Sequence, residues 1–254
     1  MKNSNIIKGS IDSIESMGLV DGPGIRTVIF MNGCRLRCKY CHNPEMWTKK
    51  ENNITPEEIV KKVLRNKPYF KNNGGVTFSG GEPLFQPEFL LETCKLLKKE
   101  NIHIALDTAG HGFGNYNEIL KYVDLVLLDI KHTNKKDYKE LTGGNIDEAD
   151  EFIKSLNKSN KKVWIRQVIV PGIMDNDEYL TSLSNKLKTI KNIERIDFLP
   201  YHKLGREKYI AMNIPYPLEN TPEMNKDECQ KLYEKIGRAH VWTPVTTISR
   251  MPSS

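Results

Sequence analysis

Short apolar runs alternate with amphipathic helical patterns along most of the 254 residues, and this alternation restricts the possible folds more than any other feature. Turn signals of Gly, Pro or Asp bound the apolar runs, as is typical of strands. Strands are predicted at residues 25–32, 75–79, 102–107, 125–130, 162–170 and 195–199, with an earlier one at 10–16. Helices are predicted at residues 87–100, 115–122, 146–158, 176–189 and 225–236.

One further helix is predicted to begin at Thr55, because Thr55 suits the N-cap, Pro56 suits the first helical position and Glu58 completes a capping box. Six strands that are each followed by a helix imply an α/β fold with a parallel sheet. A functional site is expected in the loops at the carboxyl ends of such strands. Residues 201–224 are irregular and rich in Pro, so we expect them to form a long loop over that site.

Charge and hydropathy exclude two classes of protein. The net charge is +6, but both signs are mixed along the chain, so a basic arm for nucleic acid is not expected. No stretch approaches the roughly 18 apolar residues that a membrane helix requires. The first residues lack the apolar segment of an export signal, so we expect a cytoplasmic protein whose five cysteines stay reduced.

Three of these cysteines, Cys34, Cys38 and Cys41, lie close together directly after a predicted strand. A compact loop in that place can turn three sulfurs toward one metal centre. Three thiolates leave one iron of a 4Fe–4S cluster open to an outside ligand, whereas structural zinc sites and ordinary electron-transfer clusters use four protein ligands. The alternative at this point is a zinc-stabilised binding module without catalysis, in which His42 or Cys229 is the fourth ligand.

The motifs around these cysteines resemble one superfamily. The Cys-x3-Cys-x2-Cys spacing, with Tyr40 before the last cysteine, is similar to the signature of the radical S-adenosylmethionine (SAM) superfamily. Gly80-Gly81-Glu82-Pro83 resembles its GGEP motif, which lines the methionine amino group of SAM. Within the superfamily, Asp21-Gly-Pro-Gly-Ile-Arg26 and Cys41-His-Asn43 resemble the activases of glycyl radical enzymes, especially those that act on pyruvate formate-lyase. Many other activases carry a cysteine-rich insertion that residues 42–79 lack.

The resemblance covers about residues 8–236 and implies a fold and an activity. The fold would be a partial (β/α)6 TIM-like barrel, open on one side, with the radical SAM domain at residues 1–236. The activity would be reductive cleavage of SAM at a 4Fe–4S cluster under anaerobic conditions, followed by abstraction of a glycine Cα hydrogen from pyruvate formate-lyase (formate C-acetyltransferase). The alternatives are activation of another glycyl radical enzyme, such as anaerobic ribonucleotide reductase, and a small-molecule radical reaction.

The resemblance also implies partners and site residues. Flavodoxin or ferredoxin would supply the low-potential electron, a monovalent cation would be a further cofactor, and the protein would be a monomer. Cys34, Cys38 and Cys41 would be the metal ligands and catalytic residues. The cofactor contacts would be Tyr40, Cys41, His42, Gly81, Glu82, Asp107, Asp129, Ile130, Lys131 and His202.

Four further positions have other interpretations. Asp21 either pairs with a basic residue of the substrate loop or forms a turn. Arg166 either contacts substrate or forms an internal ion pair. Cys94 lies on an apolar helical face and is expected in the core, and Cys229 has no clear role.

The last residues, 237–254, differ from the rest of the chain. They contain neither Lys nor Asn, which are frequent before them, and they continue no pattern. We expect them to be foreign or misread sequence outside the fold.

Overall fold

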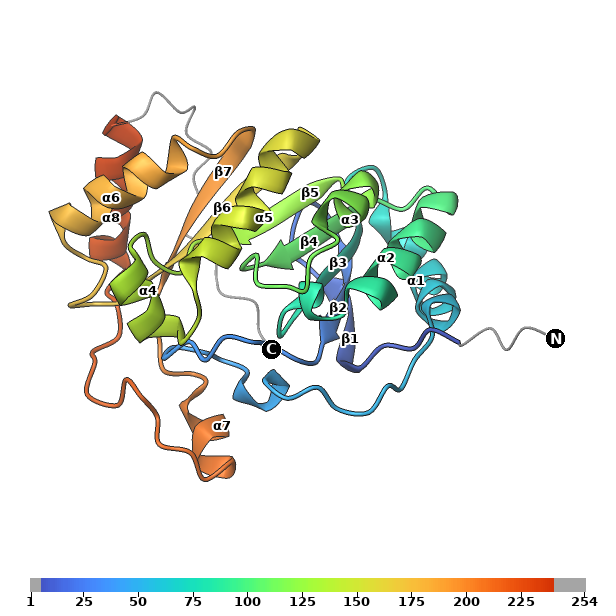
Figure 1. Cartoon of the computed structure of the whole chain (residues 1–254), viewed down its shortest axis with the longest axis horizontal. Helices are drawn as coiled ribbons and strands as arrows, with labels where there is room; N and C mark the ends of the chain where they lie inside the picture. The colour runs from blue at the N-terminus through green and yellow to red at the C-terminus, as the bar shows by residue number, and fades with distance from the viewer. Residues whose placement is uncertain (1–5, 240–254) are drawn as a thin grey trace.

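A seven-stranded sheet forms the centre of the computed structural model, which describes residues 6–239 (Figure 1). The strands lie in sequence order, with β1 antiparallel to β2 and all later neighbours parallel. Because β1 and β7 are the edges, the barrel is partial and open on one side, as expected. The strands are β1 (Ile11–Gly18), β2 (Arg26–Met31), β3 (Gly75–Gly80), β4 (Ile104–Thr108), β5 (Leu125–Asp129), β6 (Lys162–Ile169) and β7 (Ile193–Pro200).

Helices connect the parallel strands and cover one face of the sheet (Figure 1). Neighbours along the chain pack side by side, α1 on α2 and α2 on α3, and α8 packs on β7. The α-helices are α1 (Pro56–Phe70), α2 (Pro87–Lys99), α3 (Tyr116–Tyr122), α4 (Lys135–Thr142), α5 (Ile146–Ser159), α6 (Asp177–Leu187), α7 (Arg206–Ala211) and α8 (Lys226–Ala239), and the 3-10 helices are η1 (Pro44–Met46) and η2 (Pro83–Phe85). Among the described residues, no helix combines the length and the apolar composition needed to cross a membrane.

Alternation along the strands separates the core from the site. In β5, Val126 and Leu128 belong to the main core shared with the helices, whereas Leu125 and Leu127 join a separate cluster. Successive side chains of a strand point to opposite faces, so Asp129 shares the face of Leu127. This second face is the inner, concave one. It carries Ser79, Asp107 and Asp129 at the carboxyl ends of their strands, and also Arg26 at the start of β2, where Arg26 Nε donates to the Thr77 hydroxyl at 2.6 Å.

The edge strand β1 pairs irregularly with β2. The register shifts between Ile11 and Ser13 and again between Glu15 and Gly18. Most side chains in the middle of β1 are exposed or half-buried, in contrast to the fully buried β2. The ladder between β1 and β2 is therefore regular only in the middle of β1, between these two shifts.

The predicted strands and longer helices are confirmed, but two short helices were missed. Helix α4 spans two turns and buries few apolar side chains, so its pattern was too short to recognise. The expectation that residues 201–224 are entirely irregular was wrong, because α7 forms within them. Helix α8 continues past the expected boundary at residue 236 to Ala239, and the rest of the suspected tail lies outside the described residues.

The capping box at the start of α1 provides a direct test of local stability. The Glu58 backbone N–H donates to Thr55 Oγ1 at 3.3 Å, and the Thr55 N–H donates to Glu58 Oε2 at 2.8 Å. We expect Thr55→Ala to lower the free energy of unfolding by about 1 kcal/mol, since one N–H loses its acceptor. Urea denaturation followed by circular dichroism measures this change. Thr55→Ser keeps the acceptor, and equal losses for the Ala and Ser variants would contradict the prediction.

Candidate active site

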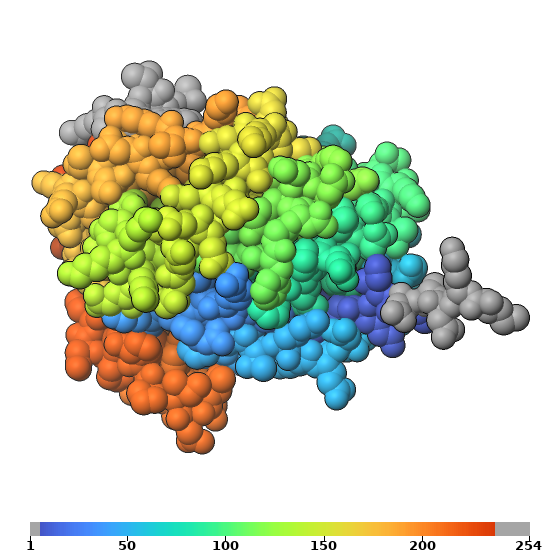
Figure 2. All heavy atoms as spheres, in the orientation of Figure 1, coloured from blue at the N-terminus to red at the C-terminus, as the bar shows by residue number. Residues whose placement is uncertain are grey.

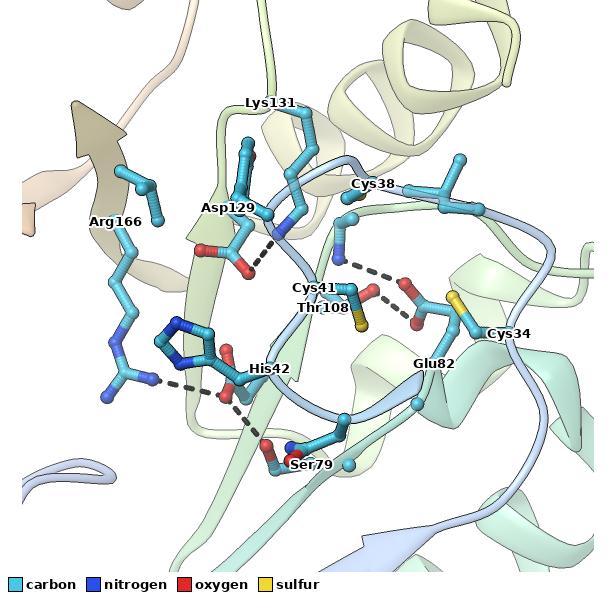
Figure 3. Close-up of a pocket in the computed structure, with 18 of the residues that line it drawn as sticks. Cys34, Cys38, Cys41, His42, Ser79, Glu82, Thr108, Asp129, Lys131 and Arg166 are labelled. Atoms are coloured by element: carbon cyan, nitrogen blue, oxygen red, sulfur yellow. Dashed lines mark hydrogen bonds and ion pairs between the residues drawn. The ribbon is translucent and has the colours of Figure 1, made fainter. Parts of the chain in front are cut away.

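A cavity opens at the carboxyl ends of the parallel strands (Figure 3). The loop after β2 lines it with Cys34, Cys38 and Cys41. The concave face of the sheet lines it with residues from β2 through β7, namely Phe30, Ser79, Asp107, Asp129, Arg166, Val168 and Leu199. The inward positions of six neighbouring strands thus meet the three cysteines at one place.

The loop that carries the cysteines is held by its backbone. Gly33 N–H donates to the Met46 carbonyl at 2.8 Å, and Cys34 N–H donates to the Trp47 carbonyl at 3.1 Å. Further along, Arg37 N–H donates to the Thr142 carbonyl at 2.7 Å. The loop is therefore fixed from both sides although it has no regular secondary structure.

All three cysteines are free thiols, with Cys38 buried and the other two half-buried. Burial raises the pKa of the Cys38 thiol to about 12, and it raises the pKa of Cys34 and Cys41 as well. These groups stay protonated in the free protein, and metal binding must displace their protons because the thiolate is the ligand form. Metal binding by this loop is thus coupled to proton release.

The geometry disfavours the ligands considered for a zinc site. Within residues 6–239, no three side chains of His, Cys, Asp or Glu are arranged to hold a single metal ion. Cys229 is fully buried in α8 and does not line the cavity. His42 Nε2 lies 3.3 Å from the His202 carbonyl oxygen. The donor set suits a cluster of several metal ions held by three thiolates.

Glu82 joins three segments beside the cysteines. Its Oε1 accepts from the Thr108 hydroxyl at 2.6 Å and from Leu84 N–H at 3.1 Å, and its Oε2 accepts from Ala109 N–H at 2.9 Å. The preceding Gly81 lies so close to the cysteine loop that a Cβ there would stand 2.5 Å from the Gly33 carbonyl oxygen. Glycine is thus required at 81 for the two loops to meet.

Two ion pairs lie on the inner face of the sheet (Figure 3). Asp107 Oδ2 accepts from Arg166 at 3.1 Å and from the Ser79 hydroxyl at 2.8 Å. Burial raises the pKa of Asp107 to about 6 although Arg166 opposes this shift. Lys131 Nζ lies 2.9 Å from Asp129 Oδ2 and 5.6 Å from the centre of the Tyr40 ring. The cavity therefore presents carboxylates and cations together rather than one sign of charge.

Arg166 also connects the sheet to the loop between β1 and β2. Its second terminal nitrogen donates to the Val20 carbonyl at 2.6 Å. Of the two interactions considered from the sequence, the structure contains the internal ion pair, with Asp107. The neighbouring Asp21 is buried, and burial raises the pKa of its carboxyl group. The Asp21 carbonyl accepts from the Thr77 hydroxyl at 2.6 Å. These contacts fold the loop against the inner face of the sheet.

His42 and His202 form a pair at the edge of the cysteine loop. Their ring centres lie 4.3 Å apart. Burial and the neighbouring imidazole lower the pKa of His42 to about 4, so His42 is neutral at physiological pH. Helix α7 supports this corner, because Gly205 packs directly against the His42 backbone.

The cavity contains most of the residues expected from the sequence. His202 and Ile130 do not line it: His202 contacts it through His42, and Ile130 is buried beside α5. Cys94 lies in the core, as expected. Trp47 was missed: it lines the cavity, and its side chain partly opposes the rise that burial causes in the pKa of Cys41. The sequence feature that could have indicated this role is the position of Trp47 shortly after Cys41. The predicted site residues that line the cavity are Cys34, Cys38, Tyr40, Cys41, His42, Gly81, Glu82, Asp107, Asp129 and Lys131.

Comparison with known proteins identifies the family. The model of the radical SAM superfamily matches residues 28–183, which include the cysteine loop, most of β2 and the strands β3 to β6. The chain belongs to the radical SAM superfamily. Radical SAM enzymes use a 4Fe–4S cluster and SAM, and the three free thiols on one loop fit such a cluster.

Curated radical SAM relatives cover nearly the whole chain. The chain is 54% identical over 231 residues to the pyruvate formate-lyase-activating enzyme of Clostridium pasteurianum, covering 89% of this chain and 96% of that protein. It is 40% identical over 241 residues to the enzyme of that name from Staphylococcus epidermidis, covering 91% and 96%.

Solved radical SAM structures share the fold. A domain of a pyruvate-formate lyase-activating enzyme from Bacteroides vulgatus superposes with a TM-score of 0.52 at 22% identity, over 65% of this chain and 95% of that one. A radical SAM methyltransferase from Sphaerobacter thermophilus gives a TM-score of 0.61 at 17% identity, over 84% and 64%. At these identities the likeness concerns the fold alone.

The buried Glu82 predicts a pH dependence of stability. Burial raises its pKa to about 7 from the ordinary 4.5, so its contribution is complete below pH 4.5 and is lost as the pH rises through 7. We expect the free energy of unfolding of the ligand-free protein to fall by roughly 3 kcal/mol more in wild type than in Glu82→Gln across this range. Urea denaturation at several pH values measures both. Asp107 titrates in both proteins, so parallel pH profiles would contradict the prediction.

Proposed function

We propose that the protein activates pyruvate formate-lyase, by reductive cleavage of SAM at a 4Fe–4S cluster and abstraction of a glycine Cα hydrogen. The observation that carries this proposal is the cavity in which three free cysteines of one loop face the polar carboxyl ends of the strands. The identity to curated activating enzymes supports the choice of partner, since it extends over nearly the full length of both chains. The reaction would take place in the cytoplasm, where thiols stay reduced.

The residues have different roles in this proposal. Cys34, Cys38 and Cys41 hold the cluster, which when bound supplies the low-potential electron that cleaves the sulfonium bond of SAM. The Gly81–Glu82 corner lies against the same loop and is suited to the methionine amino group. Tyr40, His42, Asp107, Asp129 and Lys131 line the cavity and bind the rest of the cofactor. Ile130 and His202 do not line the cavity and support its neighbouring residues, Ile130 next to Asp129 and Lys131 in the chain and His202 against the His42 ring.

The charged residues of the cavity are preorganised for a zwitterionic ligand. SAM carries an ammonium, a carboxylate and a sulfonium group, and the cavity offers both signs of charge in fixed ion pairs. Asp129 holds Lys131, and Arg166 holds Asp107, so neither cation needs to be ordered when the ligand binds. His42 is neutral and presents a ring to the ligand rather than a charge.

The open side of the barrel fits a protein substrate. Because β1 and β7 do not pair, an extended loop of another protein can enter between them and bring a glycine Cα to the cavity. The product glycyl radical is stabilised by its flanking amides. A barrel closed by eight strands would suit a small molecule better.

A monovalent cation is proposed as a further ligand near Asp107. Asp107 Oδ1 is buried and has no hydrogen-bond partner among residues 6–239, which leaves an oxygen able to bind a cation. Its neighbour Thr108 also lines the cavity, although the Thr108 hydroxyl already donates to Glu82. We also propose that the protein acts as a monomer and binds neither nucleic acid nor membrane.

The decisive test uses the reconstituted protein and two candidate partners. Under anaerobic conditions with SAM and a reductant, mixing with pyruvate formate-lyase should produce the electron paramagnetic resonance doublet of a glycyl radical. A signal only with anaerobic ribonucleotide reductase would assign the chain to that partner instead. Release of 5′-deoxyadenosine without a radical on either protein would indicate a small-molecule substrate.

Cysteine substitutions test the cluster itself. We expect Cys38→Ala to lose the iron and sulfide of the cluster and to reduce 5′-deoxyadenosine release by at least about 1,000-fold, because two thiolates cannot hold the cluster. Iron and sulfide analysis with the broad brown absorbance measures the first effect. The control is Cys94→Ala, which changes a buried cysteine of α2 far from the cavity lining. Colourless wild-type protein with stoichiometric zinc would overturn the assignment.

A further inference from the structure

The outer surface of the cysteine loop is basic. Between the three cysteines, Leu36 and Tyr40 are buried, whereas Arg35 and Arg37 are exposed and Lys39 is half-buried. Every second residue therefore points away from the cavity, and each of these outward residues is a cation. The loop presents its thiols to the inside and its positive charges to the outside.

Helix α4 extends this basic surface beyond the loop. The loop pairs with the end of α4 through Arg37 N–H to the Thr142 carbonyl, at 2.7 Å, and Lys39 N–H to the Leu141 carbonyl, at 2.9 Å. A shallow hollow beside the loop is lined by Arg35, His111, Lys135, Lys139, Gly143, Gly144, Asn145 and Glu148. Figure 2 shows the loop, in blue, reaching the surface next to the yellow-green segment of α4.

The carboxylates of this surface do not neutralise it. Glu148 pairs with Arg35 at 2.5 Å, Glu140 pairs with Lys39 at 3.2 Å, and Asp147 pairs with Lys135 at 2.9 Å. Lys139 is exposed, and in the described part of the chain neither it nor Arg37 forms an ion pair. Five cations thus face three carboxylates.

Arg37 connects this surface to the cysteines. It donates to the Cys34 carbonyl at 2.7 Å and to the Leu36 carbonyl at 2.8 Å. Its guanidinium also lies 5.0 Å from the centre of the Trp47 ring, and Trp47 lines the cavity beside Cys41. The exposed cation and the cluster ligands are therefore separated only by the thickness of the loop.

We propose that this basic face is the docking surface for an acidic electron-carrier protein that reduces the cluster. The basic face consists of Arg35, Arg37, Lys39, Lys135 and Lys139. The inference rests on the proposed function, because it assumes that the loop holds a redox cluster. In each transfer the carrier loses one electron and the cluster gains it, and no atom or bond is exchanged.

The position of the basic face favours this occupant. An electron carrier must approach the cluster closely, and the face lies directly over the loop that would bind it. The cavity takes SAM and the glycine loop from the other side of the cysteines, so carrier and substrate do not compete. Complementary charge accelerates such encounters and makes them sensitive to salt. Interleaved carboxylates such as Glu140 and Glu148 disfavour a nucleic-acid backbone, which would repel them.

A double charge reversal on α4 tests the surface without touching the cysteine loop. The variant is Lys135→Glu with Lys139→Glu, and the matched control is Lys61→Glu with Lys62→Glu on the exposed face of α1. Affinity for an acidic flavodoxin is measured by biolayer interferometry with the cluster-loaded protein. We expect the α4 variant to bind about tenfold more weakly and the control to stay within about twofold of wild type.

Salt dependence gives a second binding readout. Wild-type affinity should fall as ionic strength rises from about 20 to about 300 mM, and the fall should be smaller in the α4 variant because fewer charges contribute. Equal affinities and equal salt slopes for the α4 variant, the control and wild type would overturn the inference. Tighter binding of single-stranded RNA than of flavodoxin would overturn the choice of partner.

Kinetics separate this inference from the proposed function. SAM cleavage driven by reduced flavodoxin should slow about tenfold in the α4 variant. Cleavage driven by photoreduced 5-deazariboflavin, an uncharged small reductant, should be the same in all three proteins. Normal deazariboflavin-driven cleavage with no flavodoxin-specific loss would refute the docking surface alone. Absence of SAM cleavage in every protein with either reductant would refute the proposed function, and the docking inference with it.

Discussion

The backbone hydrogen bonds of the cysteine loop are the constraint on which the rest of the site depends. The loop is irregular, and its thiols face one cavity only because neighbouring segments supply acceptors for its N–H groups. Met46 and Trp47 hold its first residues, and the carboxyl end of α4 holds its middle. Each buried N–H without an acceptor would cost about 1–3 kcal/mol, so the loop conformation is specified well before any metal binds.

The second constraint is the meeting of this loop with the end of β3. Glu82 N–H donates to the Gly33 carbonyl at 2.9 Å, and Gly81 leaves the space that this contact needs. The Glu82 carboxylate then ties the same corner to the segment after β4 through Thr108 and Ala109. Three consecutive strand ends are thus locked together around the cavity, and the ion pairs on the inner face are built on that frame.

Much of the fold and of the site could be predicted from the sequence, since both depend on local patterns. Strand periodicity places Asp129 on the inner face once Leu125 and Leu127 are assigned to it. The capping box at Thr55 and Glu58 is recognisable because all its residues are adjacent in the chain. The cysteine motif and the glycines at 80 and 81 are likewise recognisable because the residues of each motif are close together in the chain.

The rest depends on contacts between distant residues. Arg166 reaches the Val20 carbonyl across 146 positions of the chain, and nothing near either residue signals this bond. Helix α4 is specified by its packing against the cysteine loop and α5 rather than by its own two turns. Trp47 likewise lines the cavity only because the chain after Cys41 turns back toward it, which the sequence does not indicate. Such features require the tertiary structure.

The irregular strand β1 has a consequence for the behaviour of the protein in a crowded solution. A sheet that stays open to admit another polypeptide has free edges, and free edges invite unwanted pairing between copies. The two register shifts in β1 and its charged side chains, among them Asp12 and Glu15, interrupt the straight row of N–H and C=O groups that such pairing needs. The distortion of this edge therefore disfavours pairing of β1 with a strand of another copy.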